Sequence, residues 1–203
     1  MGGDFYDFLG KTSDQLVGVL ADVSGKGISA ALLSSLLQGA LDMEIRSGME
    51  PAAALDRLNR FLCERSQPNK FVTMFLVQLG DNGDGIYISA GHNPAFLYRA
   101  ETGDVEQLES EHMILGAFEF ATYASRPLHL NLKDVLVIYT DGLTDAENPA
   151  GDMFEEDRLV RLIKEVGNSG AEALEMKILE SIEEFTQGMA QTDDITFMLL
   201  QRI

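Results

Sequence analysis

The segment that most restricts the fold is FVTMFLVQL at residues 71–79, a nearly unbroken apolar run. Such a run is typical of a β-strand covered on both faces, because a solvent-facing side would carry polar residues at alternate positions. The turn sequence DNGDG follows and leads into IYISA at residues 86–90, which predicts a β-hairpin. The chain is therefore expected to contain a sheet that other layers cover.

The order of the remaining elements predicts the class of fold. Strands are predicted at residues 4–9, 15–22, 95–99, 126–132, 135–140 and 195–203, with the turn sequence GKTSD between the first two. Helices are predicted in two pairs, at residues 27–46 and 52–65 and at residues 154–166 and 171–185. Apolar residues form a wide face on the first helix, so we expect it to be deeply packed. Since strands and helices do not alternate, the pattern predicts an α+β layered fold with antiparallel sheets covered by helices.

Composition limits the partners of this chain. Its 203 residues suit one domain, or one and a small extension, and the formal net charge is −18. Such a charge repels phosphate backbones and anionic lipid, so we expect neither nucleic-acid binding nor membrane insertion, whereas bound cations are plausible. Cys63 is the only cysteine, and we identify no signal peptide and no apolar run of bilayer-spanning length. We therefore predict a cytoplasmic protein without disulfides.

Carboxylates recur at the ends of predicted strands. Asp22 and Asp141 follow strands, whereas Asp4 and Asp193 precede them. In adjacent antiparallel strands, ends and starts alternate along one rim, so the four carboxylates could meet at one edge of the sheets. Without a cation they would repel one another, whereas with two hard divalent cations they would form an oxygen-ligand site. Each acid alone also has a plain structural explanation, such as a turn at Asp141 or a helix cap at Asp22.

Six motifs in order extend the interpretation over nearly the whole chain: GGDFYD, ADVSGKGISAALL, FVTMF, AGHNPAFLY, YTDGLTDAENPAG and TDDITFMLL. Together they resemble the SpoIIE/RsbU branch of the metal-dependent protein phosphatases (PPM), which are bacterial relatives of the type-2C serine/threonine phosphatases. The resemblance implies an α-β-β-α sandwich of two antiparallel sheets flanked by helix pairs. It also implies that residues 1–203 are a single phosphatase domain, and we expect this domain to be the C-terminal part of a longer regulated protein.

The resemblance implies a site for two Mn²⁺ or Mg²⁺ ions. Asp22 matches the carboxylate that bridges the ions, and Val23 matches the neighbour that offers its backbone carbonyl. Asp141 and Asp193 match acids on one ion, and Asp4 matches an acid that acts through bound water. With Asp22, Asp141 and Asp193 as catalytic residues, the ions would activate a water that attacks the phosphorus of phosphoserine or phosphothreonine. No covalent enzyme intermediate is implied.

Several neighbouring residues keep open interpretations. Asp7 is a weaker candidate for the metal site. The GKG sequence at residues 25–27 lacks the spacing of a nucleotide-binding P-loop, so it predicts a tight turn that leads into the helix. His92 and Asn93 belong to a family motif, which a turn between two strands explains as well as catalysis does. The arginine that clamps phosphate in the eukaryotic branch has no counterpart here, so the metals are expected to hold the phosphate.

Two other functions compete with this interpretation. YTDGLTDA resembles the haloacid-dehalogenase signature, but Tyr139 stands where that family has its nucleophilic aspartate. The other alternative is a catalytically weak, phosphatase-like docking module in partner-switching signalling. The presence of all the expected ligand acids favours the enzyme, and metal-dependent hydrolysis of a phosphoserine protein would distinguish the two.

The resemblance also implies partners. The expected substrate is a phosphorylated STAS-domain anti-anti-sigma factor or a similar regulator, in a pathway that controls sigma factors. A sensor or receiver domain in the same chain is expected to set the activity by positioning the 27–46 helix against the metal site. A homodimer is compatible with this organisation.

Overall fold

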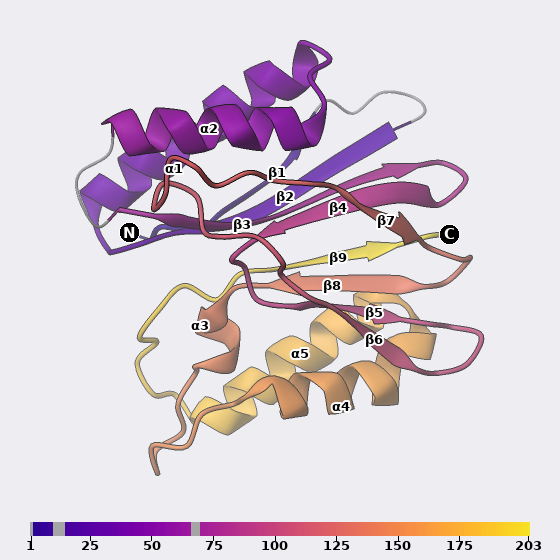
Figure 1. Ribbon diagram of the computed structural model, residues 1–203. Helices are drawn as coiled ribbons and strands as arrows, with labels where there is room; N and C mark the ends of the chain where they lie inside the picture. The colour runs from indigo at the N-terminus through magenta and orange to yellow at the C-terminus, as the bar shows by residue number, and fades with distance from the viewer. Residues whose placement is uncertain (1, 10–14, 66–69) are drawn as a thin grey trace. The chain divides into compact units, whose positions relative to one another are not determined.

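The computed structural model describes residues 2–9, 15–65 and 70–203, which form two compact units. Unit 1 comprises the chain up to Asn93 together with Glu109–His129, and unit 2 comprises Pro94–Leu108 and Leu130–Ile203. Each unit has one antiparallel sheet and a pair of long helices (Figure 1). The predicted α+β class, with two antiparallel sheets and helix pairs, is therefore confirmed.

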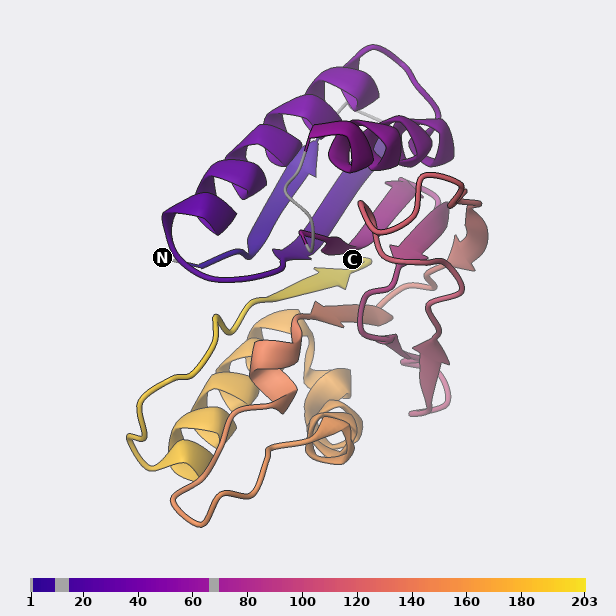
Figure 2. The ribbon, with the colours of Figure 1, turned by 60° about the vertical axis from the view of Figure 1, so that its left-hand side comes forward.

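The sheet of unit 1 has the strand order β1-β2-β3-β4-β7. Its strands are β1 (Phe5–Leu9), β2 (Gln15–Val23), β3 (Val72–Gly80), β4 (Asp84–Ala90) and β7 (Arg126–His129). Helices α1 (Ile28–Arg46) and α2 (Pro51–Arg65) cover one face of this sheet (Figure 2). The predicted pairings of β1 with β2 and of β3 with β4 are confirmed, whereas the predicted turn at residues 10–14 lies outside the described residues.

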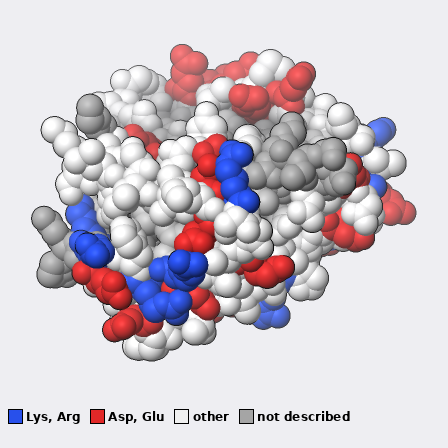
Figure 3. All heavy atoms as spheres, turned by 90° about the horizontal axis from the view of Figure 1, so that it is seen from above, with Lys and Arg blue, Asp and Glu red and all other residues white. Residues whose placement is uncertain are grey.

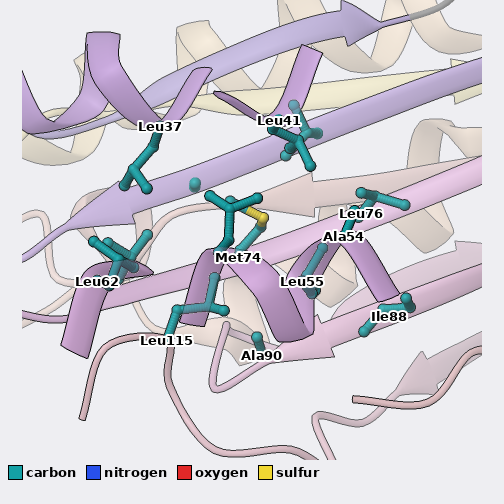
Figure 4. Close-up of a cluster of buried hydrophobic side chains, with 14 of the residues drawn as sticks. Leu37, Leu41, Ala54, Leu55, Leu62, Met74, Leu76, Ile88, Ala90 and Leu115 are labelled. Carbon is teal, nitrogen blue, oxygen red and sulfur yellow. The ribbon is translucent and has the colours of Figure 1, made fainter. Parts of the chain in front are cut away.

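The core of unit 1 lies between the helix pair and the sheet. Figure 4 shows Leu37 and Leu41 of α1 and Leu62 of α2 gathered around Met74 of β3, and all four side chains are fully buried. Burying a side chain of this size contributes about 1.5–3 kcal/mol. This layer packs against the end of β2 and the start of β3, which pair with each other. Asp22 lies at this end of β2.

The prediction that the first helix is deeply packed is wrong in part. The buried residues of α1 are Ala30, Ser34, Leu37 and Leu41, whereas Ile28, Leu32, Leu36 and Met43 are exposed. The helix packs through one side only, so its second apolar stripe faces solvent. Figure 3 looks onto this side of unit 1 and shows wide uncharged areas between the charged side chains.

The length and composition of α1 also correct an expectation. The helix has 19 residues and a mean hydropathy of 1.2, so by length and composition alone it could cross a membrane. The expectation that the chain has no such run is therefore wrong. One such helix is weak evidence for a membrane span, because helices that pack in protein cores meet the same criteria.

A buried asparagine of α2 anchors the segment between unit 1's last two strands. The amide nitrogen of Asn59 donates to the carbonyl oxygens of Phe118 at 2.9 Å and Ala121 at 3.4 Å. Its Oδ1 accepts from the backbone N–H of Gly116 at 2.8 Å. Asn59 is fully buried, so water does not reach its side chain to compete for these hydrogen bonds. The irregular segment is therefore held by side-chain hydrogen bonds where sheet pairing is sparse.

Asn59→Leu is expected to destabilise the protein by about 1–3 kcal/mol, because it removes the Asn59 hydrogen bonds of the buried Ala121 carbonyl and of the partly buried Gly116 N–H. The change should lower the midpoint of urea unfolding and leave its slope unchanged. Arg60→Leu, at the exposed neighbouring position, is the matched control and should shift stability by at most about 0.5 kcal/mol. Equal effects of the two substitutions would contradict the role given to Asn59.

The sheet of unit 2 has the strand order β6-β5-β8-β9. Its strands are β5 (Ala95–Tyr98), β6 (Val105–Leu108), β8 (Val135–Tyr139) and β9 (Phe197–Gln201), and its helices are α3 (Asp141–Thr144), α4 (Glu156–Val166) and α5 (Ala171–Thr186), with a 3₁₀ turn at Gly167–Ser169. All five residues of β8 are buried. Helices α4 and α5 bury Leu159, Ile163, Leu174 and Ile178, as their spacing predicts.

Candidate metal centre

The two acids of unit 1 lie side by side by strand register. Asp22 is the next-to-last residue of β2, and Asp4 immediately precedes β1. Phe5 pairs with Ala21 in the antiparallel ladder, so one step further along the same register places Asp4 opposite Asp22. Both side chains are partly exposed, as carboxylates that bind a ligand need to be.

Gly3 makes this close approach possible. A Cβ atom at this position would lie 2.2 Å from the carbonyl oxygen of Val23 and 3.3 Å from Oδ1 of Asp22. The hydroxyl of Ser34 in α1 donates to the carbonyl of Gly3, which ties the start of the chain to the helix. Glycine is therefore required at position 3, because a side chain there would displace the Val23 carbonyl and crowd the Asp22 carboxylate.

The chain leaves β2 through a tightly held turn. The backbone N–H of Ser24 donates to the carbonyl of Phe71 at 2.9 Å, and the Ser24 hydroxyl accepts from the N–H of Phe71 at 2.9 Å. The ammonium of Lys70 donates to the Ser24 carbonyl at 2.7 Å. Gly25 and Gly27 have φ of 91° and 84°, a conformation that favours glycine. The predicted tight turn into the helix is confirmed.

The side chain of His92 is hydrogen-bonded to β3, the strand that pairs with β2 at Asp22. Thr73 of β3 pairs with Asp22, and its hydroxyl lies 2.9 Å from Nδ1 of His92. The histidine is only 3% exposed. This burial favours the structural interpretation of His92 over a role as acid for the leaving group. Thr73 has no sequence signal of its own, because its position depends on the pairing of β2 with β3.

Asp7 lies away from this pair of carboxylates. It pairs with Val19 in the ladder, three positions before Asp22 along β2, and its Oδ2 accepts from the amide of Gln38 at 2.7 Å. Its second oxygen accepts from the N–H of Phe8 at 2.7 Å. The side chain is thus engaged with α1, and the structure favours a structural role for Asp7.

In unit 2, Asp141 begins a helical turn directly after a buried strand. β8 ends at Tyr139, and Thr140 is held by Thr196: its N–H donates to the Thr196 carbonyl at 2.9 Å, and its hydroxyl accepts from the Thr196 N–H at 3.2 Å. Asp141 is the first residue of α3, and its side chain is exposed. The turn places the carboxylate outside the core.

Gly142 brings Asp193 next to Asp141. A Cβ atom at Gly142 would lie 1.9 Å from the carbonyl oxygen of Asp194 and 3.4 Å from Cβ of Asp193. The N–H of Asp194 donates to Oδ1 of Asp193 at 2.9 Å, which fixes that side chain locally. The backbone next to Asp141 therefore approaches the Asp193–Asp194 segment closely within unit 2, and this approach depends on the glycine. The sharing of an ion by Asp141 and Asp193 stays a prediction.

Gly142→Ala is expected to displace the 193–194 backbone, because a backbone carbonyl cannot move away as a flexible side chain can. We expect a loss of about 1–3 kcal/mol of stability, as for other overpacked sites. Mn²⁺ affinity, measured by calorimetry, should fall with it. Gly39→Ala is the matched control: nothing lies within 4 Å of its Cβ position, and it should stabilise α1 slightly. Unchanged Mn²⁺ affinity in Gly142→Ala would contradict this account.

The available donors suit hard divalent cations. Unit 1 offers the carboxylates of Asp4 and Asp22 and the carbonyl of Val23, and unit 2 offers the carboxylates of Asp141 and Asp193. Over residues 2–9, 15–65 and 70–203, no group of three or more His, Cys, Asp or Glu side chains is arranged to hold a metal ion. All five donors are oxygens, the ligand type that Mg²⁺ and Mn²⁺ prefer. The residues present fit such ions in donor chemistry.

The cysteine offers no alternative nucleophile. Burial raises the pKa of the Cys63 thiol above its ordinary value, and the negative charge of Glu119 acts in the same direction. Little reactive thiolate is therefore present at neutral pH. This environment favours hydrolysis by an activated water over a cysteine-based mechanism.

Sequence comparison shows the family. The profile of "Stage II sporulation protein E (SpoIIE)" matches residues 12–203. Phosphoserine phosphatase RsbU of Bacillus subtilis is 32% identical over 203 residues, which are 100% of this chain and 60% of RsbU. The chain spans 36–60% of the length of the first curated relatives that it matches.

Solved structures show the same fold. The SiaA-PP2C domain of Pseudomonas aeruginosa has a TM-score of 0.87 at 20% identity, over 98% of this chain and 80% of that chain. The RsbU and RsbW domains of a Mycobacterium tuberculosis protein give 0.81 at 28% identity, over 99% and 55%. RsbX in complex with magnesium gives 0.69 at 18% identity, over 98% and 86%.

The structure has the fold of the solved PP2C domains, with candidate oxygen donors near strand ends. The chain belongs to the SpoIIE family.

Proposed function

We propose that the protein is a metal-dependent serine/threonine phosphatase that hydrolyses phosphoserine or phosphothreonine on a regulatory protein. The observation that carries the proposal is the pairing of acids in each unit: Asp4 with Asp22, and Asp141 with Asp193. Two glycines, Gly3 and Gly142, permit these pairings. The identity to a phosphoserine phosphatase supports the reaction.

We assign the ligand roles as follows. Asp22, the backbone carbonyl of Val23, and the carboxylates of Asp141 and Asp193 would hold the divalent cations. Asp4 acts through bound water. When present, Mn²⁺ or Mg²⁺ lowers the pKa of water and neutralises phosphate oxygens. The magnesium bound to RsbX supports this choice of ion.

The chain's own residues orient these donors. The turn at residues 24–27 fixes the Val23 carbonyl, and the pairing of Thr140 with Thr196 fixes the start of α3. Thr73 and His92 support the strand beside Asp22. Cations held by these donors would neutralise the substrate phosphate, and protein–protein contact would recognise the rest of the substrate.

We further propose a phosphorylated STAS-domain protein as the substrate, in a cytoplasmic partner-switching pathway. The identity to RsbU and the likeness to a structure that contains RsbU and RsbW domains support this proposal. Phosphate release from a purified phospho-STAS protein, compared with an unrelated phosphoserine protein, tests it. Equal rates on both would contradict it.

Regulation is proposed to act through α1. The exposed apolar residues Ile28, Leu32, Leu36 and Met43 give this helix a surface that a sensor or receiver segment of a longer chain can cover. The helix begins five residues after Val23, so a shift of α1 would move the turn that orients the Val23 carbonyl. A full-length protein with the same rate with and without its signal would contradict this mechanism.

The test of the activity is hydrolysis of a phosphoserine protein and of p-nitrophenyl phosphate with Mn²⁺, with EDTA, and by Asp22→Asn. We expect turnover only with the metal and the intact carboxylate. Activity that persists in excess EDTA would contradict the metal-dependent mechanism. Absence of turnover under every metal would favour the docking module, and calorimetry with Mn²⁺ would then show whether the acids bind ions.

A further inference from the structure

Unit 2 contains a small pocket beside its two candidate ligand acids. The pocket has a volume of about 160 Å³ and lies between α3, the end of α5 and the segment that precedes β9. At about 30 Å³ per molecule, this is room for roughly five waters, or for one side chain. It is therefore too small for a nucleotide or a helix and fits a single protruding group.

The pocket has an apolar floor. Ala146 and Ile182 are 7% and 8% exposed, and the half-buried Ile195 lies with them among the lining residues. The rest of the lining is mixed: Met189 and Ala190 are exposed apolar residues, whereas Glu147, Thr186, Gln191 and Thr192 are polar. An apolar group that enters would lose water at the floor and gain contacts with aliphatic carbon. A carboxylate would be desolvated close to Glu147, which disfavours it.

The pocket is bordered by the sequence neighbours of the two candidate ligand acids. Gly142, which follows Asp141, and Thr192, which precedes Asp193, both line it, and a Cβ atom at Gly142 would lie 1.9 Å from the Asp194 carbonyl oxygen. A phosphoprotein that presents its phosphate at Asp141 and Asp193 therefore has residues near this pocket. Met189 lies four residues before Asp193 and Ile195 two residues after it, so one segment carries both pocket-lining residues and a candidate metal ligand.

We propose that this pocket binds one apolar side chain, Leu, Ile or Met, that flanks the phosphoserine of the substrate, and so determines which site is dephosphorylated. The inference rests on the proposed phosphatase function and adds a specificity site to it. The aliphatic floor selects the side chain, and Glu147 excludes acidic residues at that position. The pocket makes no contact with the reacting phosphate and acts on substrate binding.

The test uses phosphoserine peptides in an alanine background, with Leu, Lys or Glu placed in turn at each flanking position. One position is expected to favour Leu over Ala by about tenfold in kcat/KM, the usual value of an apolar contact in a pocket. Glu should be the poorest residue at that position. A wild-type enzyme that favours Lys there, or shows no preference at any position, would overturn the proposal.

Two variants locate the preference. Ala190→Trp, at an exposed lining residue, is expected to remove the preference for Leu and leave hydrolysis of p-nitrophenyl phosphate within about twofold. Met189→Glu should lower the rate on the Leu peptide and raise the rate on the Lys peptide, each relative to p-nitrophenyl phosphate. Met176→Trp, on the exposed side of α5 and outside the pocket lining, is the control and should retain the preference.

The outcomes separate the two proposals. Retention of the Leu preference in both Ala190→Trp and Met189→Glu would overturn the proposed role of the pocket in specificity. Mn²⁺-dependent turnover in the same experiment would still support the proposed phosphatase activity. An equal loss on all substrates, p-nitrophenyl phosphate included, would also overturn the pocket as a specificity site. Failure of the wild-type protein to hydrolyse p-nitrophenyl phosphate with any metal would overturn the proposed function and this inference with it.

Discussion

Asp141→Asn and Asp22→Asn are each expected to lower metal-dependent turnover by more than about a hundredfold. Groups that only hydrogen-bond to metal ligands already cost 10–100-fold when mutated, and a ligand itself should cost more. An amide keeps the shape of the carboxylate and removes its charge. The measurement is kcat/KM for p-nitrophenyl phosphate with saturating Mn²⁺, together with the Mn²⁺ affinity by calorimetry.

The fold is expected to survive both substitutions. Asp141 contributes to α3 through its backbone carbonyl, which accepts from the N–H of Asp145 at 2.8 Å and the hydroxyl of Thr144 at 3.1 Å. Asparagine retains that carbonyl. In EDTA the variants should melt at the same temperature as the wild type or above it, because neighbouring carboxylates no longer repel each other.

Asp145→Asn is the matched control for Asp141→Asn. It removes the same charge from an exposed residue of the same turn that we assign no ligand role. Its turnover should stay within about twofold of the wild type. Unchanged hydrolysis by purified Asp141→Asn, or an equal loss in Asp145→Asn, would contradict the assignment of the ligands.

The sequence predicts those candidate site residues that lie at the ends of strands. Apolar runs locate β2 and β8, and the first acid at the end of each run is Asp22 or Asp141, so both can be singled out from sequence alone. The strand pattern also singles out Asp193, but it starts the last strand at residue 195, whereas β9 begins at Phe197, four residues after Asp193.

Close backbone approaches and cross-strand partners were beyond prediction from the pattern. Gly142 looks like an ordinary turn residue, and only the structure shows the Asp194 carbonyl that excludes a side chain there. Thr73 is one β-branched residue among many until the register pairs it with Asp22. Such features depend on contacts between segments far apart in the sequence, for which local periodicity carries no information.

The first helix shows a different limit. Periodicity identifies α1 correctly, because apolar residues recur at helical spacing. It does not determine which apolar stripe is buried, since α1 carries two. Leu37 and Leu41 pack on the sheet, whereas Leu32 and Leu36 remain exposed. The choice depends on packing against the sheet, which the periodicity of the helix does not contain.

A second large effect is expected at Asp134, a buried carboxylate of unit 2 that is 1% exposed. It accepts from the N–H groups of Ala100 and Asn131, each at 2.9 Å, and from the guanidinium of Arg99 at 2.9 Å. Burial alone would raise the pKa of Asp134, but these hydrogen bonds and the charge of Arg99 outweigh it and hold the pKa below its ordinary value. The ionised carboxylate thus joins two segments, residues 99–100 and 131–134.

Asp134→Ala is expected to destabilise the protein by about 2–4 kcal/mol, because it leaves a largely buried arginine and two backbone N–H groups without their acceptor. Arg99 also forms an ion pair with Glu106, so it keeps one partner in the variant. The loss of stability should therefore stay below the largest values measured when one member of a buried ion pair is removed. Asp104→Ala, at an exposed acid of the same unit, is the control. Urea unfolding at neutral pH measures both, and equal midpoints would contradict the role of Asp134.

The pH dependence gives an independent test of the same group. Since the pKa of Asp134 is lower in the folded than in the unfolded protein, its stabilisation is fully present above the ordinary value of about 4 and is lost as pH falls through the folded value. The stability difference between the wild type and Asp134→Asn should therefore shrink as the pH is lowered below about 4. A difference that grows on acidification would mean that the carboxyl is protonated in the folded protein and that its hydrogen bonds do not offset burial.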